Sequence, residues 1–146
     1  MAYGDIDDVE AYFKSIDFGA ATASVADAEV TDLLDRQSAR VDSKIAKKYV
    51  VPVTGTEAVK ALTDIVVRLV AATVIRILNS TVGVSENELN RAAALEKGAN
   101  ADLDALAKGT ALLSDATLAS ATALDPESYN YVNDEQPVFE KEVDQW

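Results

Sequence analysis

The fold is decided by residues 57–79, EAVKALTDIVVRLVAATVIRILN. A helix of this length spans roughly 34 Å at 1.5 Å per residue. Its charged residues Lys60, Asp64, Arg68 and Arg76 are separated by multiples of four, so they fall on one narrow stripe. The remaining surface is largely apolar, which is more than the stripe of about 100° that a surface helix buries. The segment therefore predicts a helix with neighbours on several sides, in its own bundle or in another subunit.

A membrane span is the competing interpretation, because about 20 apolar residues suffice to cross a bilayer. Asp64, Arg68 and Arg76 argue against it, since each would cost roughly 2.5–3.5 kcal/mol near the bilayer centre. We therefore expect the apolar face to form the bundle core or a subunit interface. Its strongest candidates for either role are Val67, Val70, Val74, Ile75 and Leu78.

Two further long helices are predicted, at 25–49 and 86–108. Ser24, with Asp27 three residues on, is the expected N-cap of the first, and Ser85 with Glu88 that of the second. The expected caps at the other helix ends are Asp5 for a short N-terminal helix, Thr56 for the central helix and Gly109 for the last. The lysines Lys44, Lys47 and Lys48 suit the negative end of the first long helix, and an anion site is the alternative.

These elements predict an all-α fold, a small bundle of three main helices plus a short N-terminal helix, over residues 1–113. Residues 114–146 are expected to form an extended acidic arm. Between residues 110 and 146 there are eight acidic residues and one lysine, which is more than half of the net charge of −12. Apolar and aromatic side chains spaced along this arm are typical of anchors laid on a partner. They are Tyr129, Tyr131, Val138, Phe139 and Trp146.

The composition excludes several classes of site. The chain contains no cysteine and no histidine, so disulfides, thiolate or imidazole catalysis and common zinc sites are absent. The acidic cluster at Asp5, Asp7 and Asp8 lacks the glycine and the glutamate of a calcium loop, and helix capping explains it better. We expect no metal and no cofactor. The acidic N-terminus predicts no secretory signal, and a net charge of −12 disfavours binding to duplex phosphates.

Several motifs resemble one known family in their order and spacing. Residues 39–53, ARVDSKIAKKYVVPV, join a helix to an aliphatic-proline segment, and residues 103–109, LDALAKG, end the last helix. Tyr3 with Asp8-Val9 opens the chain, and Phe139 and Lys141 precede a final aromatic residue. Together with the central apolar helix, this pattern resembles the head–tail connector (adaptor, or head-completion) proteins of tailed bacteriophages.

The resemblance implies a structural, non-enzymatic subunit that forms a homo-oligomeric ring, commonly twelve-fold, beneath the portal protein. Such a ring extends the DNA channel without binding DNA specifically, and it docks the next neck or tail-completion component. The resemblance also implies assembly in the host cytoplasm and a place in the virion. The sequence departs from the pattern at Lys48, where the family often has arginine, and in its unusually acidic tail.

Two other functions fit the charged residues. A carboxylate-based hydrolase could use Asp64 and Asp42 on facing helices, because paired carboxylates perform acid–base catalysis. An ion pair of Asp64 with Arg68 or Lys60 is the plainer interpretation of Asp64. An acidic inhibitor that mimics DNA is the third possibility, with its charge directed at a basic cleft of another protein.

Overall fold

The computed structural model describes residues 2–13 and 24–119, and all of its regular elements there are helices. The prediction of a small all-α bundle is confirmed. A short first helix is followed by three long ones, in the order α1 (Ile6–Glu10), α2 (Asp27–Ile45), α3 (Thr56–Thr81) and α4 (Glu86–Lys108). Within the described residues no helix is both long and apolar enough to span a membrane.

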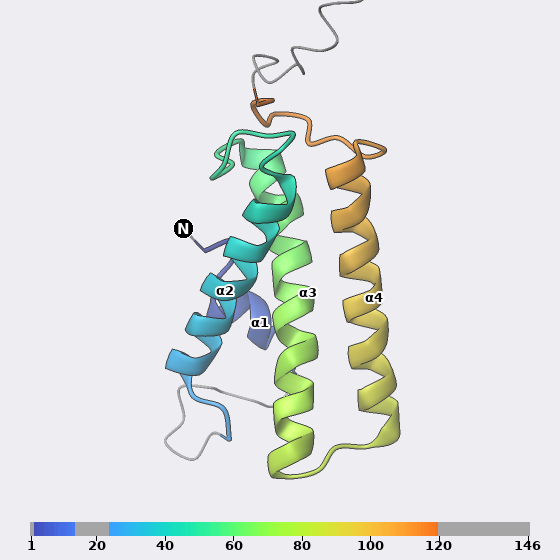
Figure 1. Cartoon of the computed structure of the whole chain (residues 1–146). Coiled ribbons are helices and arrows are strands. Elements are labelled where there is room, and N and C mark those ends of the chain that lie inside the picture. Colours follow the sequence, from blue (N-terminus) through green and yellow to red (C-terminus); the bar gives the residue numbers. More distant parts are fainter. Residues whose placement is uncertain (1, 14–23, 120–146) are drawn as a thin grey trace, which may run out of the picture.

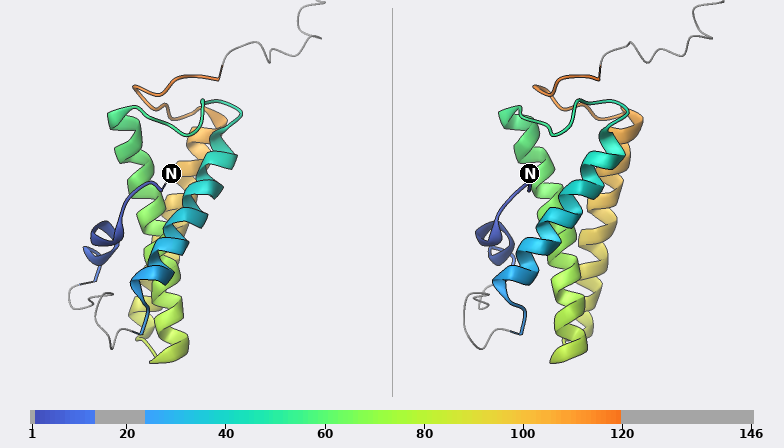
Figure 2. Two further views of the ribbon diagram at one scale, coloured as in Figure 1. Left: turned by 90° about the vertical axis from the view of Figure 1, so that its left-hand side faces the viewer. Right: turned by 60° about the vertical axis from the view of Figure 1, so that its left-hand side comes forward.

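Helix α3 is the centre of the bundle. Helices α2 and α4 run in one direction on either side of it, and α3 runs in the opposite direction (Figure 1). The short α1 packs against α2 and α3, so α3 contacts each of the other helices. The turn from α3 to α4 lies at one end, and the chain segments before α3 and after α4 lie together at the other (Figure 2).

The broad apolar surface of α3 is covered by this chain alone. The candidate core or interface residues are all at most 8% exposed, and they belong to the core; they are Val67, Val70, Val74, Ile75 and Leu78. Of the two interpretations that the sequence left open for this helix, cover by its own bundle or by another subunit, the structure shows the first. Two features explain the coverage. Alanines such as Ala92 and Ala99 of α4 are buried, and the N-terminal segment with Tyr3 and Val9 covers another side of α3.

Two of the N-caps predicted from the sequence, Asp5 and Ser85, are confirmed, and each bonds with a residue three positions further on. Asp5 and Asp8 form a reciprocal capping box at α1, and the side chain of Ser85 accepts a hydrogen bond from the Glu88 amide at α4. The prediction of Ser24 as the cap of α2 is wrong, because the N-cap is Ala26 and makes no side-chain cap hydrogen bond. Helix α2 also ends at Ile45 rather than at residue 49.

Two glycines of α4 have opposite roles. Gly98 lies inside the uninterrupted helix, where Arg68 of α3 passes over it to form an ion pair with Asp102 (2.6 Å). Gly109 ends the helix in the left-handed conformation with φ 77°, and the ammonium group of Lys48 lies where a Cβ would stand. The first position tolerates a side chain and the second requires glycine.

We therefore predict that Gly98→Ala raises the free energy of unfolding by up to about 1 kcal/mol, the difference in helix propensity. A Cβ at this position would lie 3.4 Å from the nearest Arg68 nitrogen, an ordinary contact. Gly109→Ala is the matched control, and it should lower stability because of its backbone conformation and the overlap with Lys48. Urea unfolding followed by circular dichroism measures both; a destabilised Gly98→Ala protein would contradict the prediction.

Candidate interaction surface

At the end of the bundle where α2 and α4 finish and α3 begins, hydrogen bonds join segments that are far apart in the sequence. Residues 46–55 and 110–119 cross each other there without forming helices (Figure 2). Backbone hydrogen bonds join them, from Val50 N to Thr117 O and from Ala119 N to Lys48 O, both 2.9 Å. Two segments more than 60 residues apart in sequence are thereby fixed side by side.

Tyr3 ties the N-terminus to this end. Its hydroxyl donates to Asp42 Oδ1 (2.6 Å) and accepts from Val53 N (2.9 Å), and its own amide donates to Ser38 Oγ (2.9 Å). The Tyr3 side chain is buried, and burial raises its pKa to about 12, with the hydrogen bond to Asp42 acting in the same direction. Tyr3 therefore stays neutral and connects three parts of the chain over the accessible pH range.

A second buried tyrosine, Tyr49, joins the segment after α2 to the segment after α4. Tyr49 is buried, its hydroxyl accepts a hydrogen bond from Leu113 N (3.2 Å), and its backbone pairs with Leu118. Tyr3 thus joins the N-terminal segment to α2 and to the segment before α3, and Tyr49 joins the segment after α2 to the segment after α4.

The cap of α3 comes from the far end of the described chain. Asp115 accepts hydrogen bonds from the backbone amides of Glu57 (2.9 Å) and Ala58 (2.7 Å). These amide bonds, the Glu57 one foremost, lower the pKa of Asp115. The N-cap position is Gly55, where a side chain would overlap the backbone of Asp115, so the prediction of Thr56 as cap is wrong. Sequence reasoning missed Asp115 because no local pattern links it to α3.

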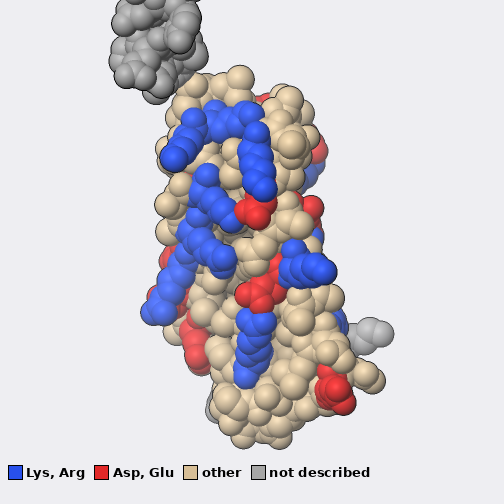
Figure 3. Space-filling model, turned by 45° about the vertical axis from the view of Figure 1, so that its right-hand side comes forward, with Lys and Arg blue, Asp and Glu red and all other residues tan. Residues whose placement is uncertain are grey.

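Cationic side chains gather towards the same end. Figure 3 shows Lys and Arg side chains concentrated on the upper part of one face, around the ends of α2 and α4. The charge changes sign along α2: between residues 27 and 35 the charged residues are acidic, whereas residues 36–48 contain five basic residues and one aspartate. Both halves suit the helix dipole. An open groove of about 530 Å³ lies between the helices and is lined by Arg40, Ser43, Lys44, Lys47 and Ala107.

Some of these cations already have partners. Lys44 pairs with Asp104 of α4, and the Arg40 guanidinium donates to Asn100 Oδ1 (3.0 Å). Lys48 lies against Gly109 at the C-terminal end of α4. Lys47 is exposed in the turn after α2 and Lys108 on the last turn of α4, and within the described residues neither forms an ion pair.

Large apolar side chains are exposed beside these lysines. Val50 is 50% exposed, Leu118 59% and Leu112 70%, and all three lie in the two crossing segments. We call this combination the basic end, defined by Lys47, Lys48, Lys108, Val50, Leu112 and Leu118. A surface that mixes cations with exposed aliphatic groups suits a ligand that carries both carboxylates and apolar anchors.

The carboxylates proposed for hydrolysis are bound in separate interactions. Asp64 pairs with Arg68 (2.6 Å), which also pairs with Asp102, while Asp42 accepts from Tyr3. The ion-pair interpretation of Asp64 with Arg68 is thus the observed one. Burial acts to lower the pKa of Arg68, but Asp102 and Asp64 outweigh it and raise that pKa. Among the described residues no three acidic side chains are grouped so as to hold a metal ion.

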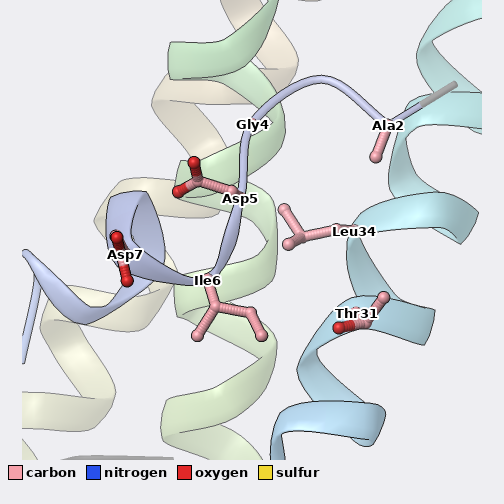
Figure 4. A pocket seen from close by; sticks show the side chains of 7 residues that line it. All are labelled: Ala2, Gly4, Asp5, Ile6, Asp7, Thr31 and Leu34. Atoms are coloured by element: carbon pink, nitrogen blue, oxygen red, sulfur yellow. The ribbon is translucent and has the colours of Figure 1, made fainter.

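A second hollow, of about 330 Å³, lies between the N-terminal segment and α2 (Figure 4). Leu34 extends from α2 towards this segment, and Ile6 lines the hollow from α1. The Asp5 carboxylate at its edge already caps α1 by accepting from Asp8 N (3.0 Å). The hollow therefore offers mainly small apolar contacts.

The proposed anchors of the arm lie outside the described residues; they are Tyr129, Tyr131, Val138, Phe139 and Trp146. The part of the arm that is described, residues 114–119, is fixed to the bundle by Asp115 and by the pairing at Tyr49. No protein family, curated protein or solved structure matches this chain.

We predict that Tyr3→Phe lowers the free energy of unfolding by about 1–3 kcal/mol, because it leaves Asp42 and the Val53 amide without their buried partner. The folded-state pKa of Tyr3 is raised, so its stabilising contribution is complete below about pH 10 and is lost as pH rises towards 12. Denaturant unfolding between pH 8 and 11 measures this. Equal slopes of stability against pH in the wild type and the variant would contradict it.

Asp115→Ala should also lower the thermal unfolding midpoint at neutral pH, since two amides of α3 lose their acceptor. The folded-state pKa of Asp115 is lowered, so its contribution is present above about pH 3.9 and is lost as pH falls through the folded value. The difference between the wild type and the variant should accordingly shrink at pH 2. Thr56→Ala, at the position first expected to cap α3, is the control with little expected effect.

Proposed function

We propose that this chain is a structural subunit of a tailed-bacteriophage head–tail connector, forming a ring of twelve copies under the portal protein. In this role it extends the DNA channel and docks the next neck or tail component, without catalysis. The observation that carries the proposal is the set of motifs that resemble this family. Within it, Tyr3 binds Asp42 and Val53, while Tyr49 binds the segment after α4.

The charge distribution supports the proposal. A net charge of −12 on each copy, repeated around a ring, would repel DNA phosphates within about one Debye length, roughly 8 Å at physiological salt. DNA would then slide through the ring without adhering to it. The burial of α3 limits where copies can meet, because its apolar residues are already in the core. The docking surfaces in this proposal are therefore the basic end and the acidic arm.

The test is electron microscopy of the chain mixed with the portal protein encoded in the same genome. We expect rings of this chain on one face of the portal. Deletion of residues 125–146 should leave a helical protein that no longer docks, because the apolar anchors of the arm are lost. Phe139→Ala with Trp146→Ala is the point-variant form of the same test, and Glu140→Gln is the matched substitution that spares the anchors.

Two outcomes are informative in different ways. If the full-length chain does not associate with the portal under any assembly condition, the connector proposal is wrong. If the truncated chain docks as well as the full-length chain, the connector proposal stands and the assignment of the arm as the docking element is wrong.

A further inference from the structure

We propose that the acidic C-terminal segment, residues 120–146, binds the basic end of its own bundle when the chain is free in solution. The ligand of this surface is thus a part of the same chain. The inference rests on charge, exposure and the path of the backbone, and it does not depend on the connector function.

The backbone path delivers the segment to the surface. Ala119, the last described residue, donates its amide hydrogen bond to Lys48 O (2.9 Å), so residues 120–146 begin beside one of the lysines of the basic end. An extended chain of this length reaches up to about 90 Å, whereas α3 is roughly 39 Å long. The length of the segment therefore does not restrict which part of the bundle it can contact. The contact site is set by how well the charges and apolar groups of the segment match those of the bundle surface.

The composition of the segment matches the surface in two respects. Residues 120–146 contain seven acidic residues and one lysine, opposite Lys47, Lys48 and Lys108. The segment also carries aromatic residues, the counterpart of the exposed side chains of Val50, Leu112 and Leu118. The role of lysines at helix ends explains their positions but gives no reason for the exposed apolar groups beside them.

The acidic groups that belong to the bundle near this end are already bound. Asp104 pairs with Lys44, Asp42 accepts from Tyr3, and Asp115 accepts from the α3 amides. Within the described residues Lys47 and Lys108 form no ion pair, and the carboxylate whose pKa the charge of Lys108 helps to lower, Asp104, is already paired with Lys44. The segment that follows Ala119 supplies seven carboxylates and begins beside Lys48.

Tethering makes even a weak contact effective. A covalent link between a short segment and its binding surface gives an effective concentration in the millimolar range, so a contact with a millimolar dissociation constant is substantially occupied within one chain. The same contact between separate chains at micromolar concentration would be almost empty. Nucleic acid is a poorer ligand for the basic end, because it would meet a chain of net charge −12 and compete with the attached acidic segment.

Zero-length carbodiimide cross-linking of the full-length chain tests this directly, since it joins only carboxylates and amines in contact. At micromolar protein and low salt we expect tail carboxylates to link to Lys47, Lys48 and Lys108 at least about five-fold more often than to the exposed lysines Lys60 and Lys97. The links should be within one monomer. Raising the salt to about 0.5 M should reduce them several-fold, because screening weakens exposed ion pairs.

Charge reversal gives the matched comparison. The double variant Lys47→Glu, Lys108→Glu should lose most tail links to Lys48, and the double variant Lys60→Glu, Lys97→Glu should retain them. Circular dichroism verifies that both remain helical, and the salt dependence of the wild type tests the proposal independently of either variant. Links spread evenly over the lysines, links insensitive to salt, or links only between copies would each overturn it.

Discussion

The structure depends on the burial of one helix that is apolar around most of its circumference. In α3 even positions on opposite sides of the helix, such as Ile65 and Val67, which are about 200° apart around its axis, are nearly inaccessible. A chain of 146 residues covers such a helix only by using every element it has. Helices α2 and α4 cover two sides, and the N-terminal segment with α1 covers a third. This requirement explains why a five-residue helix at the N-terminus belongs to the core.

Once α3 is enclosed, its ends must be completed with polar groups from elsewhere. The N-cap residue of α3 is Gly55, which has no side chain to accept hydrogen bonds from the first amides of the helix. Asp115 lies so close to Gly55 that no side chain would fit there. Asp115 supplies that acceptor from 57 and 58 residues away, and Tyr3 joins α2 to the segment before α3. Hydrogen bonds at the bundle end therefore fix the segments that contain Tyr3 and Asp115 relative to the helices, which hydrophobic burial alone leaves undetermined.

The sequence predicted those features that are encoded within a few residues. Periodicity located the three long helices, and the Asp5 and Ser85 caps were found because cap and partner lie three residues apart. The cap of α3 and the contacts of Tyr3 could not be found, since their partners are distant in sequence. Periodicity also left open whether α3 is covered by its own chain or by another subunit. Periodicity shows how much of the α3 surface is apolar. It does not show how closely the alanines of α4 or the irregular N-terminal segment pack against that surface.

The enclosure of α3 changes what kind of association this protein supports. An interface built on α3 would be apolar and insensitive to salt, as in obligate oligomers. With those residues in the core, the association that we propose would use the basic end and the acidic segment after residue 119, which combine charges with a few apolar groups. Contacts of that kind are modest individually, respond to ionic strength and exchange partners readily. A subunit that stays apart until it meets its assembly site is better served by such surfaces than by an exposed apolar helix, because an exposed helix of that kind would aggregate.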